Sequence, residues 1–323
     1  AVVLTAVVAL ALAPQIYLFS HVTDDAYISF RYARRLAEGH GLTFNPGERV
    51  EGFSNPLWTL LTAAAIRLTP FAAPEIAKSL GILCSVLTIG CAWRIFRREK
   101  IAMPSRIGNF ALFGAMLVAN PGFHVYMTAG LEGPLLMLLL TVGVGLTLEK
   151  GRPSQYLAAG AFGLAAITRP EGLLYGLLWF AFTFGPTIST GRPRCRELVR
   201  FALLLTPWLM YEIFRAIYFG ALLPNTYAAK PPGVFGGDNL GIRYLWPWVG
   251  ALGGMVPIAV FVLLRAGRAR QTKILFRTCA GPLIAAVIFV AYARGDWMPF
   301  GRFLVPVWPI VCIALVSWFH YAL

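Results

Sequence analysis

Long apolar segments are the feature that most constrains how this chain of 323 residues can fold. AVVLTAVVALALAPQIYLF stands at the amino terminus, and LLMLLLTVGVGLTL follows in the middle of the chain. Overall, 58% of the residues are hydrophobic, 13% are charged and the mean hydropathy is +0.68, which leaves too little polar surface for a water-soluble domain. A membrane β-barrel would show short segments of alternating polarity instead. The sequence therefore predicts an all-α integral membrane protein.

The basic residues lie mostly in short tracts between the apolar segments, namely RIFRREK, EKGR, GRPRCRELVR and RAGRARQTK. The net charge of +14 would suggest nucleic-acid binding in a soluble protein. Here the placement follows the positive-inside rule, so the tracts are predicted to be cytoplasmic loops and no nucleic-acid partner is expected. Residues 55–68 are too short for a span and contain Arg67, so we interpret them as a juxtamembrane or re-entrant helix on the outer face. The charge pattern then fits about ten spans, over 2–20, 76–96, 107–127, 132–148, 155–168, 172–188, 199–219, 244–264, 275–292 and 303–322.

The whole chain, 1–323, is predicted to be one transmembrane domain, with residues 21–75 as an outer loop that carries juxtamembrane helices. Residues 2–20 lack the basic start and the cleavage site of a signal peptide, so we expect them to be retained as the first span. The five cysteines have no metal-ligand spacing, and neither a disulfide nor a zinc site is expected. Most acidic residues fall on the outer side of this topology, so the polar chemistry is predicted to lie there.

Two neighbouring aspartates, Asp24 and Asp25, follow the first span directly. Aspartate is a preferred residue before a helix, and one of the pair is explained by capping. A second carboxylate at the membrane boundary is costly unless it is used or paired. We therefore consider a catalytic role for the pair, as a general base that accepts a proton from a sugar hydroxyl.

The segment 25–38 forms an amphipathic helix on a helical wheel, with Arg31 among the arginines of one face and apolar side chains such as Phe30 opposite. Such a helix lies flat on a membrane surface. Its guanidinium groups match the oxygens of a lipid phosphate in two-pronged hydrogen bonds. The alternative is that they hold anionic lipid headgroups.

Four further polar clusters are predicted on the outer side, in GLEGPLL, ITRPEGLLYG, GALLPNTYAAKPPG and ARGDWMPFGRFLVP. Each also has a structural interpretation: a charged first turn, a mutually neutralising ion pair, a non-helical loop and an interfacial aromatic belt. An ionised group at this depth is nevertheless a functional-site hypothesis by default. The candidates are Glu132, Arg169, Glu171, Asn225, Lys230, Asp296, Trp297 and Arg302. Glu212 and Arg215, three apart on one helix face, are predicted to be a structural pair.

The segment TDDAYISFRYARRLAEGHGLTFNPGERVEGFSNPLW, followed in order by AGLEGPL, TRPEGLL, LLPNTYAAK and GDWMPFGRFLVP, resembles the membrane glycosyltransferases of the GT-C type. The resemblance is greatest to the mycobacterial terminal β-(1→2) arabinofuranosyltransferases and covers most of the chain. It implies a GT-C-like helical bundle in the bacterial inner membrane with a periplasmic active site. Members of that group carry a soluble domain after the membrane part, and we expect it to be absent or truncated here.

The resemblance also implies a mechanism: inverting transfer of a sugar, arabinofuranose, from a polyprenyl-phosphate carrier to a glycan or glycoprotein acceptor. Asp24 or Asp25 is then the base, Glu132 helps to place the acceptor, and Arg169, Lys230 and Arg302 hold the donor phosphate. We add Arg31 to the phosphate ligands, and Glu171, Asn225, Asp296 and Trp297 to the acceptor side. No cofactor is expected. A divalent metal would supplement the arginines, but with several basic candidates outside we favour a metal-independent site.

Three alternatives stay open at this point. One is a non-catalytic membrane scaffold, against which the paired aspartates and the outer arginines argue. A mannosyl- or other hexosyltransferase of the same type would use the same lipid carrier and the same kinds of residues. A flippase or transporter of lipid-linked sugars would need a polar path through the bilayer and commonly shows inverted repeats, and neither feature is evident in the sequence.

Overall fold

The computed structural model describes residues 2–17, 21–98, 103–149, 151–188, 195–226, 244, 270–296 and 298–322. Within these ranges the chain is helical and contains no β-strand. The helices are α1 (Val2–Tyr17), α2 (Ala26–Ala37), α3 (Pro56–Leu68), α4 (Ala73–Arg98), α5 (Met103–Val118), α6 (Pro121–Thr128), α7 (Gly133–Leu148), α8 (Arg152–Ala166), α9 (Gly172–Ile188), α10 (Cys195–Phe219), α14 (Arg270–Ala293) and α15 (Trp308–Ala322), with 3-10 turns η1 (Pro299–Gly301) and η2 (Val305–Val307). The predicted span 244–264 lies outside the described residues, apart from Tyr244.

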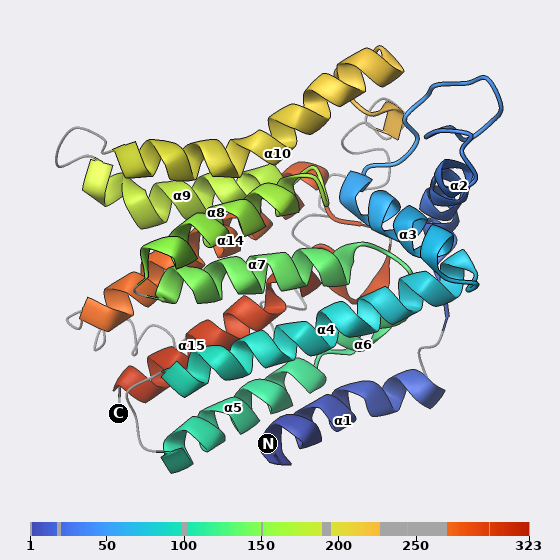
Figure 1. Cartoon of the computed structure of the whole chain (residues 1–323). Coiled ribbons are helices and arrows are strands. Elements are labelled where there is room, and N and C mark those ends of the chain that lie inside the picture. Colours follow the sequence, from blue (N-terminus) through green and yellow to red (C-terminus); the bar gives the residue numbers. More distant parts are fainter. Residues whose placement is uncertain are drawn as a thin grey trace.

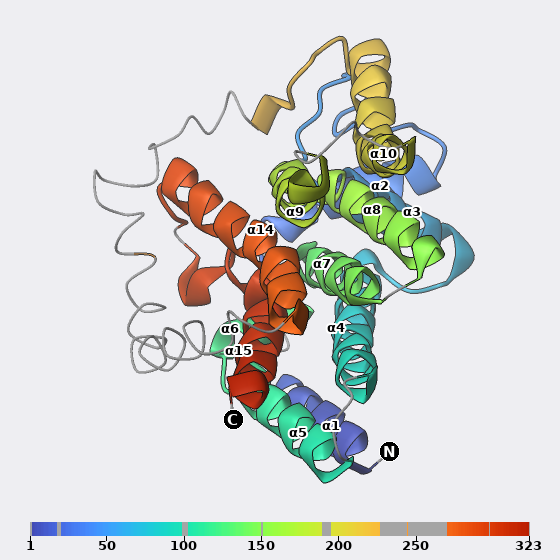
Figure 2. The ribbon, with the colours of Figure 1, turned by 90° about the vertical axis from the view of Figure 1, so that its left-hand side faces the viewer.

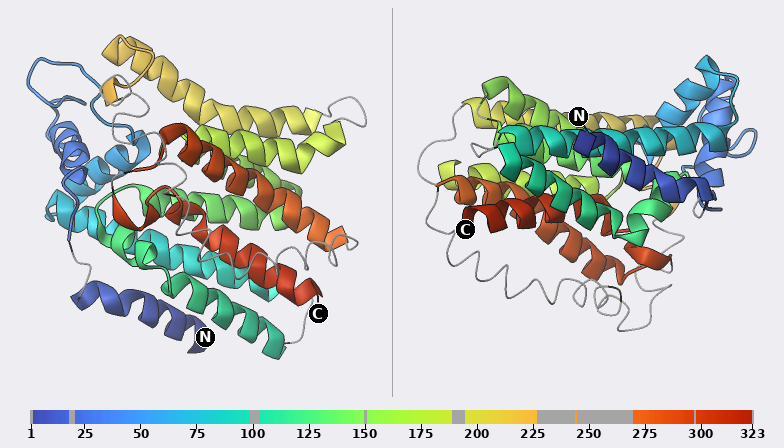
Figure 3. Two further views of the ribbon diagram at one scale, coloured as in Figure 1. Left: turned by 180° about the vertical axis from the view of Figure 1, so that it is seen from behind. Right: turned by 90° about the horizontal axis from the view of Figure 1, so that it is seen from below.

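Most of the helices run alongside one another, and α2 and α3 gather at one end of the bundle (Figure 1). Viewed nearly along the helices, α4 and α7 lie in the middle, α8, α9 and α10 on one side, and α1 and α5 on the other (Figure 2). The same order is seen from behind (Figure 3, left). The bundle thus has two distinct ends joined by long helices.

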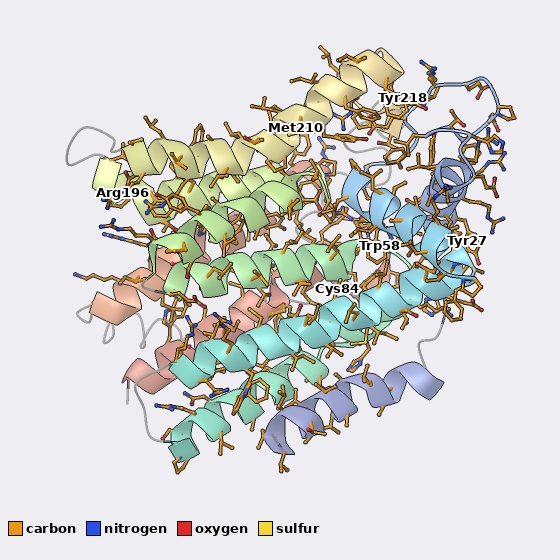
Figure 4. The ribbon with its side chains drawn as sticks, in the orientation of Figure 1. Tyr27, Trp58, Cys84, Arg196, Met210 and Tyr218 are labelled. Atoms are coloured by element: carbon orange, nitrogen blue, oxygen red, sulfur yellow. The ribbon has the colours of Figure 1, made fainter. Side chains whose placement is uncertain are left out.

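The two ends differ in the chemistry of their side chains. At one end, which we call the α2/α3 end, lie the first outer loop and helices α2 and α3; Tyr27 marks it in Figure 4. At the other, the basic end, Arg94 and Arg98 of α4 pair with Glu149 at 3.0 and 2.6 Å, and Arg196 of α10 is at the same end. Helix α4 has 26 residues and separates the two ends by about 39 Å at 1.5 Å per residue. The tract RIFRREK and the two aspartates therefore lie at opposite ends, as the charge pattern predicts.

Three helices in the described part of the chain are long and apolar enough to cross a membrane: Ala73–Arg98, Lys273–Ala293 and Pro299–Trp318. Four shorter apolar helices accompany them, at Val2–Pro14, Pro56–Leu68, Gly133–Leu148 and Gly172–Pro186. The all-helical membrane architecture follows from these segments. The number of spans, about ten, stays a prediction.

The predicted span over 107–127 is not one continuous helix, and its two pieces together are long and apolar enough for a broken span or a re-entrant loop. The segment breaks after Val118 into α5 and α6, which are bent by 71° relative to each other. The cause is local, because Pro121 disfavours a helical conformation at the residue before it. Asn120 is accordingly extended, with φ −90° and ψ 110°, and its side chain caps α6 by accepting a hydrogen bond from Gly122 N at 2.9 Å.

Helix α2 confirms the helical-wheel prediction for the first outer loop. Its inner face buries Phe30, Tyr32 and Ala33, whereas Arg31 and Arg34 are exposed. Phe30 packs with Trp58 of α3 and with residues of α4, α6 and α7 in one apolar cluster. This cluster fixes α2 and α3 over the ends of the long helices.

Candidate active site

The two aspartates at the start of α2 have different surroundings. Asp24 is exposed, and its Oδ1 accepts a hydrogen bond from the backbone N–H of Asp25 at 3.0 Å. Asp25 occupies the N-cap position, yet its side chain makes no capping hydrogen bond. Its Oδ2 lies 3.8 Å from Nη1 of Arg302 instead. Capping therefore does not account for the Asp25 carboxylate, which faces a cation from the far end of the sequence.

Beside this pair lies a buried ion cluster built from two separate turns. The guanidinium of Arg169 binds Glu132 through Nη1 and Glu171 through Nε. All three side chains are largely buried, with 12% of Arg169, 5% of Glu132 and 3% of Glu171 exposed. The sequence predicted the Arg169–Glu171 pair, and the fold adds Glu132 to it.

Glycines bring these turns close enough for the charges to meet. Gly130, with φ +81°, packs so tightly under α2 that an added Cβ would lie 3.0 Å from Phe30 and Val22. Gly172 is closer still, since its Cβ would fall 1.9 Å from the carbonyl oxygen of Ala165. Only glycine avoids both clashes. The tight turns place Glu132 and Arg169 next to each other.

Asn55, just before α3, links the ion cluster to α2. Its Nδ2 donates a hydrogen bond to Oε2 of Glu132 at 2.7 Å. Its Oδ1 accepts hydrogen bonds from Ser29 at 2.9 Å and Thr59 at 3.1 Å. The sequence analysis did not single out Asn55, because an Asn before Pro at a helix start reads as a cap. The side chain makes no capping hydrogen bond and points into the site instead.

Arg302 is held by an unusual turn before α15. Its Nε lies 2.7 Å from Oδ2 of Asp296, in addition to the contact with Asp25. Phe300 has φ +60°, a conformation that costs a non-glycine residue about 1–3 kcal/mol. The turn is supported by Tyr126 of α6, whose hydroxyl donates a hydrogen bond to the Pro299 carbonyl at 2.6 Å. A strained backbone conformation of this kind persists only where contacts with the surrounding structure hold it in place.

One aromatic ring and one small cavity connect the two arginines. The guanidinium carbons of Arg169 and Arg302 lie 5.3 and 5.1 Å from the centroid of the Phe303 ring, within range of cation–π attraction. Both arginines also line a small cavity together with Tyr126, Leu131, Gly133, Val305 and Pro306. The ion cluster and the Asp25–Arg302 pair therefore form a single site at the α2/α3 end.

Burial and charge act in opposite directions on this site. Burial by itself raises the pKa of Glu132, but the Arg169 guanidinium and the Asn55 hydrogen bond outweigh it, so the pKa lies below its ordinary value. Burial lowers the pKa of Arg169, and the carboxylates of Glu171 and Glu132 more than reverse this. Both groups are therefore ionised at neutral pH.

The other predicted site residues lie apart from this cluster or outside the described ranges. Arg31 is exposed, and its guanidinium donates hydrogen bonds to Phe44 O at 2.7 Å and Asn45 Oδ1 at 3.3 Å. The backbone N–H of Asn225 donates to the Glu51 carbonyl at 3.0 Å, so Asn225 lies against the first outer loop. Lys230 and Trp297 lie outside the described residues. Over the described ranges, no group of three or more His, Cys, Asp or Glu side chains is arranged to hold a metal ion.

No protein-family model matches the chain. Two curated proteins are similar to it, both named terminal beta-(1->2)-arabinofuranosyltransferase. The one from Mycobacterium tuberculosis is 30% identical over 223 residues, which are 65% of this chain and 35% of that protein. The one from Corynebacterium glutamicum is 29% identical over 230 residues, 65% of this chain and 33% of that protein. The predicted resemblance is confirmed.

Solved structures extend the similarity to the fold of the whole chain. The crystal structure of ArnT from Cupriavidus metallidurans bound to undecaprenyl phosphate matches 98% of this chain and 59% of ArnT, with a TM-score of 0.69 and 17% identity. The archaeal oligosaccharyltransferase AglB from Archaeoglobus fulgidus, in complex with an inhibitory peptide and a dolichol-phosphate, matches 98% of this chain and 50% of AglB, with a TM-score of 0.51 and 11% identity. The chain has an ArnT-like fold, and it spans about a third of the length of its curated relatives.

Proposed function

We propose that the chain is a GT-C type glycosyltransferase that moves arabinofuranose from a polyprenyl-phosphate carrier to a glycan or glycoprotein. The names of the two curated relatives support the sugar, and the lipid phosphates bound to ArnT and AglB support the carrier. The observation that carries the proposal is the 3.8 Å approach of the Asp25 carboxylate to the Arg302 guanidinium. It supports the proposal because a carboxylate that can act as a base lies beside a cation, and such a transfer needs both groups.

In the proposed reaction, an acceptor hydroxyl attacks the anomeric carbon from the face opposite the phosphate, so the configuration inverts. The bond between that carbon and the phosphate oxygen breaks, and its electron pair leaves with the polyprenyl phosphate. The hydroxyl proton passes to Asp25. General-base catalysis typically contributes about 10²–10⁴-fold, and fixed cations stabilise the negative charge that develops on the leaving phosphate.

We assign the base to Asp25 rather than to Asp24. The Asp25 side chain is 28% exposed and faces the site, whereas Asp24 is exposed and its Oδ1 accepts the backbone N–H of Asp25. Asp25 is therefore both accessible to an acceptor hydroxyl and directed at the reacting centre. Asp24 in this arrangement orders the start of α2.

The charged side chains divide between substrate binding and support. Arg169 is already bound to Glu132 and Glu171, and both oxygens of Glu132 are engaged, by Arg169 and by Asn55. We therefore propose that Arg169 and Glu132 support the site, and that Arg302 and Lys230 bind the donor phosphate. Oε2 of Glu171 is buried and, among the described residues, has no hydrogen-bond partner, and we propose Glu171 for the acceptor side, where this oxygen would accept a hydrogen bond from a sugar hydroxyl. Asn225, Asp296 and Trp297 remain proposed for the acceptor side.

We further propose that about ten helices cross the bacterial inner membrane and that the α2/α3 end faces the periplasm. The distribution of basic tracts supports this orientation. The acceptor then arrives from the periplasm, and the carrier reaches the site from within the lipid. A carrier in the bilayer removes the need for a nucleotide sugar.

The test is transfer by purified protein in detergent, with decaprenyl-phosphoryl arabinofuranose or mannose as donor and an arabinan oligosaccharide as acceptor. We expect arabinofuranose to be transferred, also in the presence of EDTA, and the configuration to invert. Asp25→Asn should lower the rate by about 10²–10⁴-fold, and Asp24→Asn should lower it far less. Equal rates for wild type and Asp25→Asn would refute the assignment of the base.

The same assay separates the alternatives. Transfer from the mannose donor alone would identify a hexosyltransferase. If neither donor reacts, proteoliposomes loaded with a fluorescent lipid-linked sugar measure movement between leaflets, which a flippase would accelerate. Movement without transfer would overturn the proposed function.

A further inference from the structure

We infer that Arg302 exchanges partners during the reaction, and that the donor phosphate releases Asp25 from Arg302 so that the base is free only when the donor is bound. The inference rests on the proposed function and concerns the regulation of the same site. It makes Arg302 a positioning residue for the base as well as a ligand of the phosphate. Its grounds are the contacts, exposure and charge of the groups around Arg302.

Arg302 holds its two carboxylates unequally. Asp296 is close, with Oδ2 2.7 Å from Nε, and only 6% of its side chain is exposed. Asp25 is farther, at 3.8 Å from Nη1, and 28% of its side chain is exposed. The contact with Asp25 is therefore the weaker of the two and the easier to replace with an anion that arrives at the surface of the site.

Arg302 also has unused hydrogen-bonding capacity. A guanidinium has five N–H donors, and the described residues provide Arg302 with ion pairs but no hydrogen bond of good geometry; its buried Nε is unsatisfied even beside Asp296. Arg169, in contrast, donates hydrogen bonds to two carboxylates. A phosphate with several acceptor oxygens satisfies Arg302 better than the single distant oxygen of Asp25 does.

The framework keeps Arg302 in place while its partner changes. Its guanidinium rests 5.1 Å from the centroid of the Phe303 ring, and the preceding turn is fixed through Tyr126 and Pro299. Gly122 lies against the same turn, since a Cβ there would be 2.4 Å from the Phe300 carbonyl oxygen. The mobile partner is therefore Asp25, which begins a helix at the rim of the site.

The charges explain why the exchange is needed. Four carboxylates surround two guanidinium groups: Glu132 and Glu171 at Arg169, and Asp25 and Asp296 at Arg302. With all six ionised, this cluster is formally negative and repels a phosphate. A donor phosphate therefore needs direct contact with a guanidinium whose partner it can replace, and Asp25 is the most weakly bound of the four carboxylates. Once released, the Asp25 carboxylate has no cationic partner and is available to the acceptor hydroxyl.

The experiment measures the affinity of the purified protein in detergent for undecaprenyl phosphate, with no acceptor and no turnover. Asp25→Asn removes the competing carboxylate, so we expect the lipid to bind roughly two- to fivefold more tightly, the range for a partly exposed ion pair. Arg302→Gln should weaken binding roughly ten- to a hundredfold, because a charge-assisted contact is lost. In the Arg302→Gln background, Asp25→Asn should have no further effect.

Asp24→Asn is the matched control, because it removes the same charge from the neighbouring residue without touching Arg302. We expect it to leave the affinity within about twofold. Equal tightening by both Asn variants, or the same effect of Asp25→Asn with and without Arg302, would overturn the inference. Arg302→Met, which also removes the charge, provides the coupling test if Arg302→Gln does not fold. If the protein transfers the sugar but the effect of Asp25→Asn on lipid affinity does not depend on Arg302, this inference alone is refuted. If that effect depends on Arg302 but no sugar is transferred, the proposed function alone is refuted.

Discussion

Nε of Arg215 lies 2.6 Å from Oε2 of Glu51, although the two residues are 164 positions apart in the chain. Tyr211 donates a second hydrogen bond to Oε1 of Glu51 at 2.6 Å, and Arg215 also binds Glu212. These contacts fasten the first outer loop to the end of α10, where Tyr218 lies beside the loop (Figure 4). The predicted structural pair of Glu212 and Arg215 is thus confirmed, and Glu51 is its additional member.

Glu51→Gln should destabilise the protein by about 3–5 kcal/mol, because it leaves Arg215 without its main counter-charge in a buried position. Only 1% of the Glu51 side chain and 9% of the Arg215 side chain are exposed. Chemical denaturation in detergent measures the loss. Glu48→Gln serves as control. Glu48 is exposed, and among the described residues its carboxylate accepts one side-chain hydrogen bond, from Asn45. Equal stability of the two variants would contradict the prediction.

Asn55→Ala should cost about 1–3 kcal/mol, because it removes a hydrogen bond from the buried Glu132 carboxylate. Asn55→Asp should cost more, since it brings a second carboxylate against Glu132. The free energy of unfolding distinguishes the two variants. Asn45→Ala, on the exposed loop, should change stability by less than about 0.5 kcal/mol. A harmless Asn55→Asp substitution would show that the Asn55–Glu132 contact is not formed.

The stability provided by Glu132 should depend on pH. Burial raises the pKa of Glu132, but Arg169 and the hydrogen bond from Asn55 stabilise the ionised carboxylate more strongly. The pKa in the folded protein therefore lies below the ordinary 4.5. The folded protein therefore binds this proton less readily than the unfolded chain does. The stability that ionised Glu132 contributes is therefore complete above pH 4.5. It is lost as the pH falls through the pKa that Glu132 has in the folded protein.

Melting temperatures of wild type and Glu132→Gln, measured from pH 7 down to pH 3.5, check this dependence. The advantage of the wild type should be constant at neutral pH and should shrink on acidification below about 4.5. Glu38→Gln is the control, because Glu38 is exposed and, among the described residues, its carboxylate has one ion-pair partner, His40 at 3.5 Å. A wild-type advantage that grows on acidification would show that the pKa is raised instead.

Cysteine labelling in intact cells tests the orientation. The outer cysteine must replace an exposed residue without a clash, and Gly41 in the first outer loop does not qualify, because it has φ +78° and a Cβ there would lie 2.6 Å from the hydroxyl of Tyr218. Glu48→Cys, on the exposed loop, should react with an impermeant maleimide, whereas Ser105→Cys, at the start of α5, should not. The exposed native Cys195 is changed to Ser in both. Labelling at 105 but not at 48 would reverse the proposed topology.

Much of the fold follows from the sequence because its signals are local. The alternation of apolar and cationic residues predicts α2, and the short apolar run before Arg67 predicts α3. The positive-inside rule predicts, without knowledge of any contact, that Glu132, Arg169 and Glu171 lie on the same side of the membrane. The break at Asn120 also has a local cause, the proline that follows it. The sequence did not predict this break, because the segment is apolar on both sides of it.

The pairing within the site does not follow from local signals. Asp25 and Arg302 meet through the packing of α2 against the turn before α15, and no spacing along the chain encodes that contact. Asn55 has the sequence context of a helix cap, and only its distance to Glu132 reveals another role. Arg31 belongs to the cationic face as predicted, but its guanidinium is occupied by the loop around Phe44.

The bend between α5 and α6 has a consequence for the chemistry at the far end of the chain. Because the chain turns by 71° at Asn120, α6 leaves the direction of its neighbours and presents Tyr126 and Gly122 to the strained turn at Phe300. A straight helix would carry both residues elsewhere, and that turn would lose its support. A single proline at position 121 thus helps to set the position of Arg302, 181 residues later, so a substitution at this kink should displace a guanidinium that it does not contact.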